Sequence, residues 1–296
     1  MISIIICSIN TANLSDIKKN ISDTIGIEYE IIAVDNRVES KGICEVYNFA
    51  ARESKFDILC FMHEDIKMHS ENWGSKVLSI FRQNTNAGVV GVAGSTYKSL
   101  TPSSWHCYDI DASEALNYNI IQNYKYSQKE RVLEFSNPRQ ADLERVVCLD
   151  GVWLCCTKSA FNFYQFDEKL LNAFHGYDLD FCLGVGQKYS VFVTFDILIE
   201  HFSEGNFNKI WLKEILKVHQ KWSSKLPVNL IGLRDEKIAV EEKRGFKNLL
   251  IRMHKEKFSA MEMLMVIVNA RKSKIMTFKL YVKLLNFWLK VIFRGH

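Results

Sequence analysis

The residues best suited to chemistry are His63, Glu64 and Asp65, which directly follow the short apolar run Ile58–Met62. A run of this length and composition predicts a buried strand, and α/β sheets bind ligands at the carboxyl ends of such strands. In an extended segment His63 and Asp65 project to one side and Glu64 to the other. An imidazole and a carboxylate on one face suit Mn²⁺, Zn²⁺, or Mg²⁺ assisted by substrate phosphates. A polar strand end that only meets solvent is the alternative interpretation.

Two more polar residues close apolar runs. Asp35 lies at the end of Tyr29–Asn36, and His201 follows Ser190–Ile199. If these runs are neighbouring strands, both side chains reach the edge of the sheet where His63 lies. Each also has a structural interpretation, Asp35 as a turn residue and His201 as the filler of a strand end.

The second half of the chain contributes a further group. Asp150-Gly151 interrupts an apolar stretch, and His175 precedes Asp178 and Asp180 at the start of a predicted helix. A positioned carboxylate can accept a proton from a hydroxyl nucleophile. The structural alternative is that these carboxylates only favour the positive end of the helix dipole, and that His175 is a hydrogen-bonded core residue.

The predicted elements alternate between strands and helices in the first 62 residues, which indicates an α/β fold with a mostly parallel, Rossmann-like sheet flanked by helices. No glycine-rich fingerprint follows the first strand, which argues against a dinucleotide-binding site. The stretch from Gly94 to Glu144 is polar and irregular, which indicates either a binding loop or lid or a disordered segment. The predicted strands are Met1–Ser8, Tyr29–Asn36, Phe56–Met62, Ala87–Ala93 and Ser190–Ile199, and the predicted helices are a short one from Ser15 and those over Gly42–Ser54, Ser70–Asn84 and Phe207–Trp222.

The composition describes a folded protein with a basic tail. A hydrophobic content of 48% and a charged content of 24% are ordinary for a globular chain. The residues from Arg244 onward carry a net charge of +10 and the preceding residues −6. Eight dispersed cysteines, Cys107 among them, and the lack of a signal peptide favour reduced thiols in a cytoplasmic protein.

With its elements in this order, the chain resembles the inverting family 2 glycosyltransferases, and within them the bacterial glycosyltransferase-like group. The likeness covers about residues 1–205. It implies a GT-A catalytic domain over residues 1–205 and a helical extension over residues 206–296. The segments that carry it are Ser3–Asn10, Val34–Asn36, Cys60–Ile66, Asp150-Gly151, His175–Phe181 and His201.

The resemblance also implies roles for single residues. Asp178 takes the place of the catalytic base, and a divalent metal, Mn²⁺ or Mg²⁺, would be held by His63, Asp65 and His201. Two positions depart from the family pattern, because His63 replaces the first Asp of the Asp-x-Asp motif and Tyr177 replaces a Glu. Donor contacts are implied for Ser8, Asn10, Asp35, Glu64 and Asp65, and acceptor-side positions for Asp150, Gly151, His175 and Asp180.

The implied reaction moves a sugar from a nucleotide-sugar donor to a hydroxyl of a glycan or lipid-linked acceptor, as in surface polysaccharide or glycolipid assembly. One alternative is a nucleotidyltransferase, which would want a glycine- and basic-rich loop that Ser8–Ser15 lacks. The other is a catalytically silent sugar-binding or scaffold protein, which the departures at His63 and Tyr177 make plausible.

The segment Met276–Arg294 predicts an amphipathic helix. Lys279, Lys283 and Lys290 recur along one edge, and apolar side chains fill the other side. Such a helix suits an anionic membrane, which would make the protein peripheral on the inner face of the plasma membrane. The alternative is that its apolar face packs on the catalytic domain. We expect no nucleic-acid partner, because no recognised motif accompanies the charge.

Overall fold

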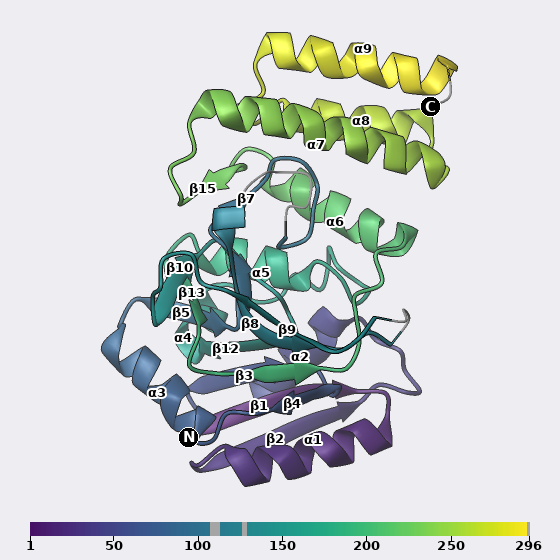
Figure 1. The fold of residues 1–296 in the computed structure, drawn as a ribbon. Helices are drawn as coiled ribbons and strands as arrows, with labels where there is room; N and C mark the ends of the chain where they lie inside the picture. Colours follow the sequence, from purple (N-terminus) through teal and green to yellow (C-terminus); the bar gives the residue numbers. More distant parts are fainter. Residues whose placement is uncertain (107–112, 126–128, 295–296) are drawn as a thin grey trace.

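The computed structural model describes residues 1–106, 113–125 and 129–294. Its centre is a mixed seven-stranded sheet (Figure 1). Five strands run in one direction, and β10 and β12 run against them. In spatial order the strands are β10 (Leu143–Val146), β13 (Ser190–Thr194), β5 (Ala87–Gly91), β12 (Trp153–Thr157), β3 (Ile58–Met62), β1 (Ile2–Ser8) and β2 (Tyr29–Asp35).

The central strands are buried on both faces, as their unbroken apolar runs predict. Successive side chains alternate between the two faces, so Ile4 and Ile6 belong to one apolar cluster, whereas Ile5 and Phe61 belong to the other. Helices α1 (Thr11–Thr24) and α3 (Trp73–Gln83) supply residues to the first cluster, and α2 (Ile43–Glu53), α4 (Lys158–Phe163) and α5 (Tyr177–Val185) supply residues to the second.

A second sheet, of six strands, stands beside the first, and half of these strands lie wholly or largely in the stretch that we expected to be irregular. That expectation was wrong, because these strands are short and pair with segments distant in the sequence. The strands in order are β11 (Cys148–Leu149), β6 (Ala93–Ser95), β8 (Leu116–Gln122), β14 (Ile199–His201) and β4 (Ile66–Met68), and β9 (Val132–Ser136) pairs with β8. A short 3₁₀ helix, η1 (Ser113–Ala115), precedes β8, and β7 (Tyr97–Lys98) and β15 (Val228–Asn229) form a separate two-stranded sheet.

Several predicted boundaries differ from the structure. Helix α1 begins at Thr11, because the Asn10 side chain caps it by accepting hydrogen bonds from two backbone N–H groups; Ser15 lies inside the helix. Helix α3 begins at Trp73 rather than Ser70, and the run Ser190–Ile199 breaks into β13 and β14. Seven cysteines of the described residues are free thiols, and Cys107 lies outside those residues.

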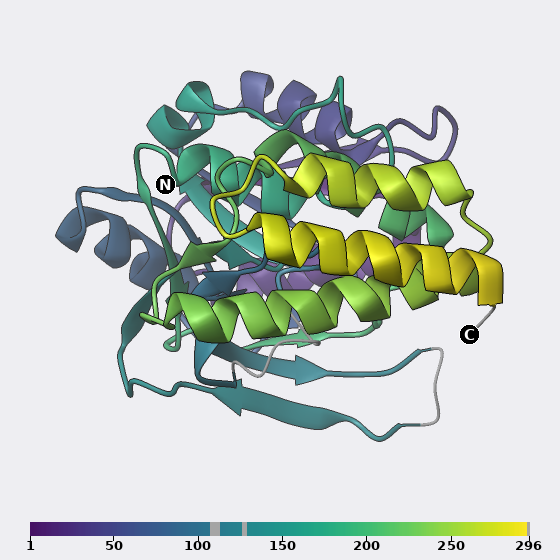
Figure 2. The same ribbon diagram turned by 90° about the horizontal axis from the view of Figure 1, so that it is seen from above.

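The C-terminal part forms a helical layer above the sheets, made of α7 (Asp235–Lys255), α8 (Ala260–Ala270) and α9 (Phe278–Arg294), with α6 (Lys209–Trp222) beneath it (Figures 1 and 2). Leu280, Leu284 and Val291 of α9 are buried, and α9 contacts both α7 and α8. The packing interpretation is therefore correct for this apolar stripe. Among the described residues, none of the helices combines the length and apolar character that crossing a membrane requires.

Glu242 joins this helical layer to the segment that follows β7. Its fully buried carboxylate accepts hydrogen bonds from the Tyr97 hydroxyl (2.7 Å) and from the backbone N–H groups of Leu100 (2.8 Å) and Thr101 (2.7 Å). The Thr101 hydroxyl donates a fourth hydrogen bond, at 2.6 Å. Four donors directed at one carboxylate compensate for its removal from water.

We predict that Glu242→Gln lowers the free energy of unfolding by about 2–3 kcal/mol, because an amide nitrogen would face donors that now meet an oxygen. Thermal and urea unfolding measure this loss. The matched control is Glu236→Gln, at an exposed position in the first turn of the same helix, which should change stability by less than about 0.5 kcal/mol. Equal effects of the two changes would contradict the role of Glu242.

Candidate functional site

Residues 63–65 form the turn that carries the chain from β3 of the first sheet to β4 of the second. Glu64 fixes this turn by binding the end of β1. Its carboxylate accepts hydrogen bonds from the Ser8 hydroxyl (2.6 Å) and from the backbone N–H groups of Ile9 (3.0 Å) and Asn10 (2.9 Å). Both oxygens are thus used to hold the carboxyl ends of β1 and β3 together. His63 and Asp65 project from the other side of the turn, as their alternation in an extended segment predicts.

Strand pairing in the second sheet brings His201 to this turn. Strand β14 is antiparallel to β4, with His201 opposite Ile66, and parallel to β8, with His201 opposite Gln122. The histidine therefore lies one residue from Asp65 across one ladder and beside an amide across the other. No local sequence signal specifies these pairings, which join residues more than 75 positions apart.

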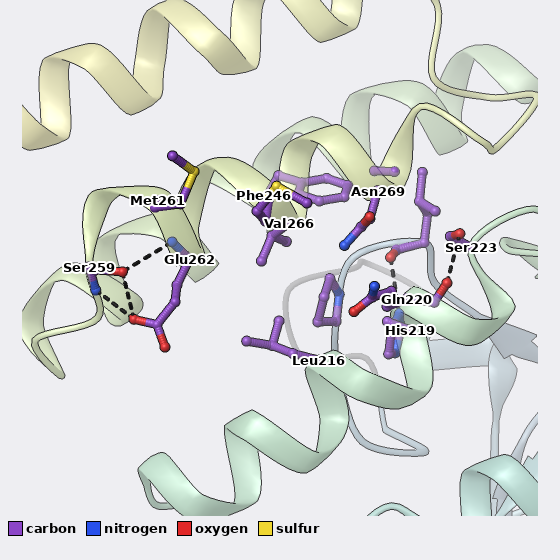
Figure 3. Close-up of a pocket in the computed structure, with 14 residues that line it drawn as sticks. Leu216, His219, Gln220, Ser223, Phe246, Ser259, Met261, Glu262, Val266 and Asn269 are labelled. Carbon is purple, nitrogen blue, oxygen red and sulfur yellow. Dashed lines mark hydrogen bonds between the residues drawn. The ribbon is translucent and has the colours of Figure 1, made fainter. Parts of the chain in front are cut away.

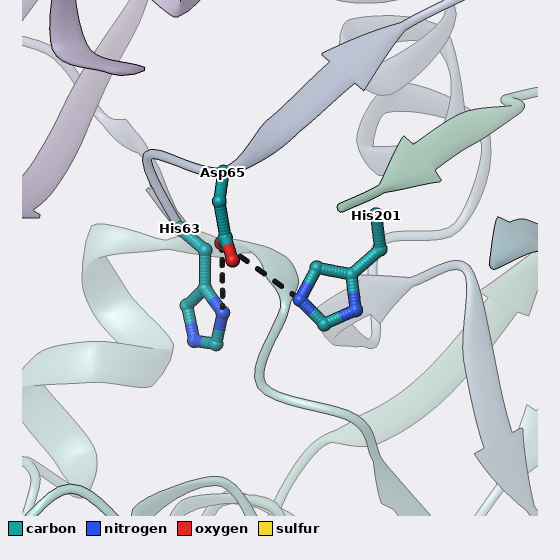
Figure 4. A group of neighbouring side chains, drawn as sticks. All are labelled: His63, Asp65 and His201. Carbon is teal, nitrogen blue, oxygen red and sulfur yellow. Dashed lines mark ion pairs between the residues drawn. The ribbon is translucent and has the colours of Figure 1, made fainter. Parts of the chain in front are cut away.

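His63, Asp65 and His201 converge on one point (Figure 4). Asp65 Oδ1 lies 3.9 Å from His63 Nδ1 and 3.8 Å from His201 Nε2. The three candidate ligand atoms lie within 4.8 Å of one another, and the other carboxylate oxygen of Asp65 accepts a hydrogen bond from the Ser203 hydroxyl at 2.6 Å. The group is only partly exposed, with 12–33% of each side chain accessible.

The hydrogen bonds of the outer ring nitrogens set the histidine tautomers. The Tyr177 hydroxyl donates to the Gly151 carbonyl (3.0 Å), so it accepts from Nε2–H of His63 (2.9 Å). Nδ1 of His201 faces the Gln122 carbonyl oxygen at 3.3 Å and must carry the proton there. In the neutral form of each ring, the unprotonated nitrogen faces Asp65.

This arrangement fits a divalent cation. The buried Nε2 of His201 has no hydrogen-bond partner among the described residues, and burial lowers the pKa of this histidine, which keeps the ring neutral. Two lone pairs facing a carboxylate oxygen repel it unless a cation lies between them. Imidazole ligands suit Zn²⁺ and carboxylate ligands suit Mn²⁺, so this mixed set of two imidazoles and one carboxylate is compatible with either ion. His63, Asp65 and His201 would be the ligands.

The backbone of Gly151 connects this group to Asp178. Its carbonyl accepts from the Tyr177 hydroxyl, and its N–H donates to Asp178 Oδ2 at 3.2 Å. Tyr177 and Asp178 are both in the first turn of α5, so the start of one helix binds both backbone polar groups of one residue. A Cβ at position 151 would collide with the Tyr177 hydroxyl, which makes glycine necessary there.

Asp178 has the electrostatics of a proton acceptor. Burial, followed by repulsion from Asp150, raises its pKa from an ordinary carboxyl value to about 7. Asp150 is itself fixed, because its carboxylate accepts from Trp105 Nε1 (2.8 Å) and from the backbone N–H of Val152 (3.0 Å). A carboxylate with a pKa near 7 is a stronger base than an ordinary one and is still substantially deprotonated at neutral pH.

The expected donor residues lie at the carboxyl ends of β1 and β2. Asp35 is opposite Ser8 in the parallel ladder, and it is exposed and ion-paired with Arg37. The hydrogen bonds from Arg37 lower the pKa of Asp35 to about 2. Asn10 uses its side-chain oxygen to cap α1. The structure therefore places Ser8, Asn10 and Asp35 at one edge of the sheet with Glu64. The Glu64 carboxylate, however, is already used in hydrogen bonds within the protein.

We expected Asp180 on the acceptor side of the site, but the structure places it in the core. Its carboxylate is fully buried and accepts from the Tyr164 hydroxyl (2.8 Å) and Trp222 Nε1 (2.8 Å), and it pairs with Lys221. One helical position beyond Leu179, it points into the core towards α6 rather than towards Gly151. His175 is half-buried, with its pKa lowered by burial, and precedes α5.

Sequence reasoning missed four groups that support the site. Ser203 binds Asp65, Gln122 binds His201, Trp105 binds Asp150, and Tyr177 binds His63. Ser203 follows His201 closely in the sequence, so its position was a usable signal. Gln122 and Trp105 lie in the stretch that had no recognisable pattern.

The chain also contains an apolar cavity of about 260 Å³ between α6 and α8 (Figure 3). Leu216, Phe246 and Val266 line it, and none of the predicted site residues does. Two of its polar residues, Ser259 and Glu262, are hydrogen-bonded to each other as the capping box of α8. The cavity therefore marks the seam between the helical layer and the core rather than the reactive group.

The two sheets, the turn between them and the acidic start of α5 define the GT-A class of glycosyltransferases. Two solved structures show this fold. GalNAc-T7, solved with UDP, GalNAc and Mn²⁺, matches with a TM-score of 0.53 and 9% identity over 98% of this chain and 57% of that chain. TarS of S. aureus matches with a TM-score of 0.52 and 11% identity over 98% of this chain and 53% of that chain.

The family follows from the sequence. A sequence model of the glycosyltransferase-like family matches residues 3–225, which is most of the chain. The protein therefore belongs to the glycosyltransferase-like family. A search of curated protein sequences gives no significant match.

We predict that Tyr177→Phe weakens Mn²⁺ binding by about 10- to 100-fold, because the hydroxyl that fixes the His63 tautomer is lost. Isothermal titration of the full chain with MnCl₂ measures the affinity. His201→Ala, which removes a ligand, should abolish binding, and Tyr189→Phe, a tyrosine outside the site, should leave it unchanged. Wild-type affinity in Tyr177→Phe would contradict the tautomer argument.

Proposed function

We propose that this protein is an inverting, metal-dependent glycosyltransferase that moves a sugar from a nucleoside-diphosphate sugar to a hydroxyl acceptor. The observation that supports this most is the backbone of Gly151: its N–H binds Asp178, and its carbonyl binds the Tyr177 hydroxyl, which in turn binds the His63 imidazole. A base and a candidate cation group are thereby held at a fixed separation in one site. Sugar transfer from a diphosphate donor needs both.

Asp178 is the proposed base. An acceptor hydroxyl is a poor nucleophile, and a positioned carboxylate that takes its proton contributes about 10²–10⁴ in rate. The raised pKa of Asp178 suits this step, and its tie to the Gly151 N–H orients the carboxylate. In this proposal no covalent sugar–enzyme intermediate forms. The acceptor oxygen displaces the nucleoside diphosphate from the anomeric carbon in a single step, so the configuration at that carbon is inverted.

His63, Asp65 and His201 are the proposed metal ligands, and Mn²⁺ or Mg²⁺ the proposed ion. When bound, such an ion offsets the negative charge that develops on the departing diphosphate, an effect of several kcal/mol. GalNAc-T7, which shares the fold, was solved with UDP and Mn²⁺, and this supports both the nucleotide and the ion. Ser203 and Gln122 keep the ligands oriented.

The donor nucleoside would occupy the edge formed by the ends of β1 and β2, near Ser8, Asn10 and Asp35. There Asp35 would exchange its pairing with Arg37 for a contact with the nucleoside. Asp150, Gly151 and His175 are the proposed acceptor-side residues. A glycan or lipid-linked acceptor of surface polysaccharide or glycolipid assembly, reached from the cytoplasm, is the proposed physiological substrate.

We predict that Asp178→Asn reduces transfer by at least about 100-fold while the donor affinity remains within about twofold, because the base acts on the acceptor and not on the donor. Transfer is followed with MnCl₂, a panel of nucleotide sugars and candidate acceptors, and donor affinity by thermal shift. Asp16→Asn, an exposed aspartate on α1, is the matched control. Equal loss of both quantities would assign Asp178 to donor binding or folding, and no donor binding at all would favour a silent scaffold protein.

The pH dependence gives a second prediction. The base must be deprotonated, so kcat/KM should rise with pH and reach half its limit near the Asp178 pKa of about 7. Asp150→Asn removes a negative charge that raises this pKa, so the midpoint should move to lower pH. An unchanged midpoint in Asp150→Asn would show that another group titrates.

A further inference from the structure

Helix α9 has apolar side chains on two opposite faces. Leu280, Leu284 and Val291 are buried against the other helices of the layer. Phe278 is 80% exposed and Phe293 is 79% exposed, and both lie on the other side of the helix. A helix that buries only one apolar stripe in a globular protein normally carries polar residues on the opposite face. Helix α9 departs from that rule.

The outward apolar residues form a continuous stripe. With 3.6 residues per turn, Phe278, Val282, Leu289 and Phe293 fall on one line along the helix, directly opposite the buried residues. Leu289 is 41% exposed. Helix α9 is also the outermost element of the helical layer, farthest from the sheets (Figure 1), and it lies uppermost when the molecule is viewed from above (Figure 2). The stripe therefore faces away from the protein.

One edge of this stripe is cationic. Lys279, Lys283 and Lys290 follow it along the helix, and all three are exposed. From Met263 to His296 the sequence contains seven lysines and arginines and no aspartate or glutamate. The partner must therefore accept apolar side chains and several positive charges over the length of one helix.

We propose that the outward face of α9 docks on an anionic phospholipid bilayer. Phe278, Leu289 and Phe293 enter the interface between head groups and acyl chains, and the lysine edge binds lipid phosphates. The inward stripe stays packed in the protein, so the helix is a fixed part of the fold and not a segment that unfolds onto lipid. Docking is independent of the chemistry at Asp65 and Asp178.

The charge pattern favours lipid over other partners. A second copy of the chain would bring the same lysine edges together, and no acidic side chain follows Glu262 to neutralise them. A nucleic acid would bind the lysines but leave the phenylalanine stripe in water. A bilayer with acidic head groups satisfies both the charge and the apolar surface.

Co-sedimentation of the full chain with vesicles tests the proposal. The protein should bind vesicles of 70% phosphatidylcholine and 30% phosphatidylglycerol at 150 mM NaCl, and bind pure phosphatidylcholine far more weakly. The triple change Lys279→Gln, Lys283→Gln and Lys290→Gln should weaken binding roughly a hundredfold. The pair Phe278→Ser and Phe293→Ser should weaken it roughly tenfold or more.

The matched control exchanges three exposed lysines at the opposite end of the molecule, Lys18→Gln, Lys19→Gln and Lys67→Gln, and should bind as the wild type does. Unchanged melting temperatures and donor hydrolysis in all variants would show that the fold and the reactive site are intact. Wild-type binding by the α9 variants, equal loss in the control, or no binding to anionic vesicles would overturn the proposal. So would dimerisation without lipid that Phe278→Ser and Phe293→Ser abolish, or binding to single-stranded DNA that both sets of α9 changes weaken equally.

Discussion

The backbone of Gly151 and the two side chains that bind it are the constraint on which the site depends. Tyr177 and Asp178 are adjacent at the start of α5, and each binds one of the two backbone polar groups of Gly151. Because Tyr177 also accepts from His63, the first turn of one helix positions both the proposed base and one of the candidate metal ligands. A shift of α5 would therefore disturb both parts together. The buried contacts of Asp180 with Tyr164, Lys221 and Trp222 hold α5 against such a shift.

One contact accounts for the two positions, His63 and Tyr177, at which the chain departs from the family pattern. His63 stands where an aspartate is usual and Tyr177 where a glutamate is usual, and the two side chains are hydrogen-bonded to each other at 2.9 Å. An aspartate at 63 would not need a partner to set its protonation, whereas a histidine does, because only one of its two nitrogens can face a cation. The tyrosine supplies that partner. The pair keeps a candidate metal ligand at the turn while lowering the negative charge of the site.

The helical layer packs on the rest of the protein and shares its apolar core. Its apolar residues belong to the same cluster as Phe61 and Leu154 of the central sheet, and Glu242 binds the segment after β7. The family match extends to residue 225, so it takes in α6 beneath the layer and ends before α7. On α9 the outer side of the layer exposes phenylalanine, leucine and lysine side chains. A rigid helix held in this way presents its outer face without an ordering cost at the moment of binding.

The sequence by itself determined the elements that depend on local pattern. The unbroken apolar runs identified β1, β2 and β3, helical spacing identified α2 and α6, and the polar residues at the ends of those strands marked the edge where His63 and Asp65 lie. The amphipathic pattern also identified α9, but it did not decide whether the apolar face of this helix packs on the protein or on a membrane. Each of these signals lies within about 20 residues, where the period of the secondary structure fixes the direction of the side chains.

The tertiary structure alone decided how distant segments meet. His201 reaches Asp65 through the pairing of β14 with β4, and Gln122 reaches His201 through β8, a strand in a stretch that carries no clear period. Asp178 and Asp180 look equivalent in the sequence, yet one faces Gly151 and the other is buried against Trp222. Pairing between segments 75–140 residues apart depends on the whole packed fold, because many alternative short strands offer the same local hydrogen bonds.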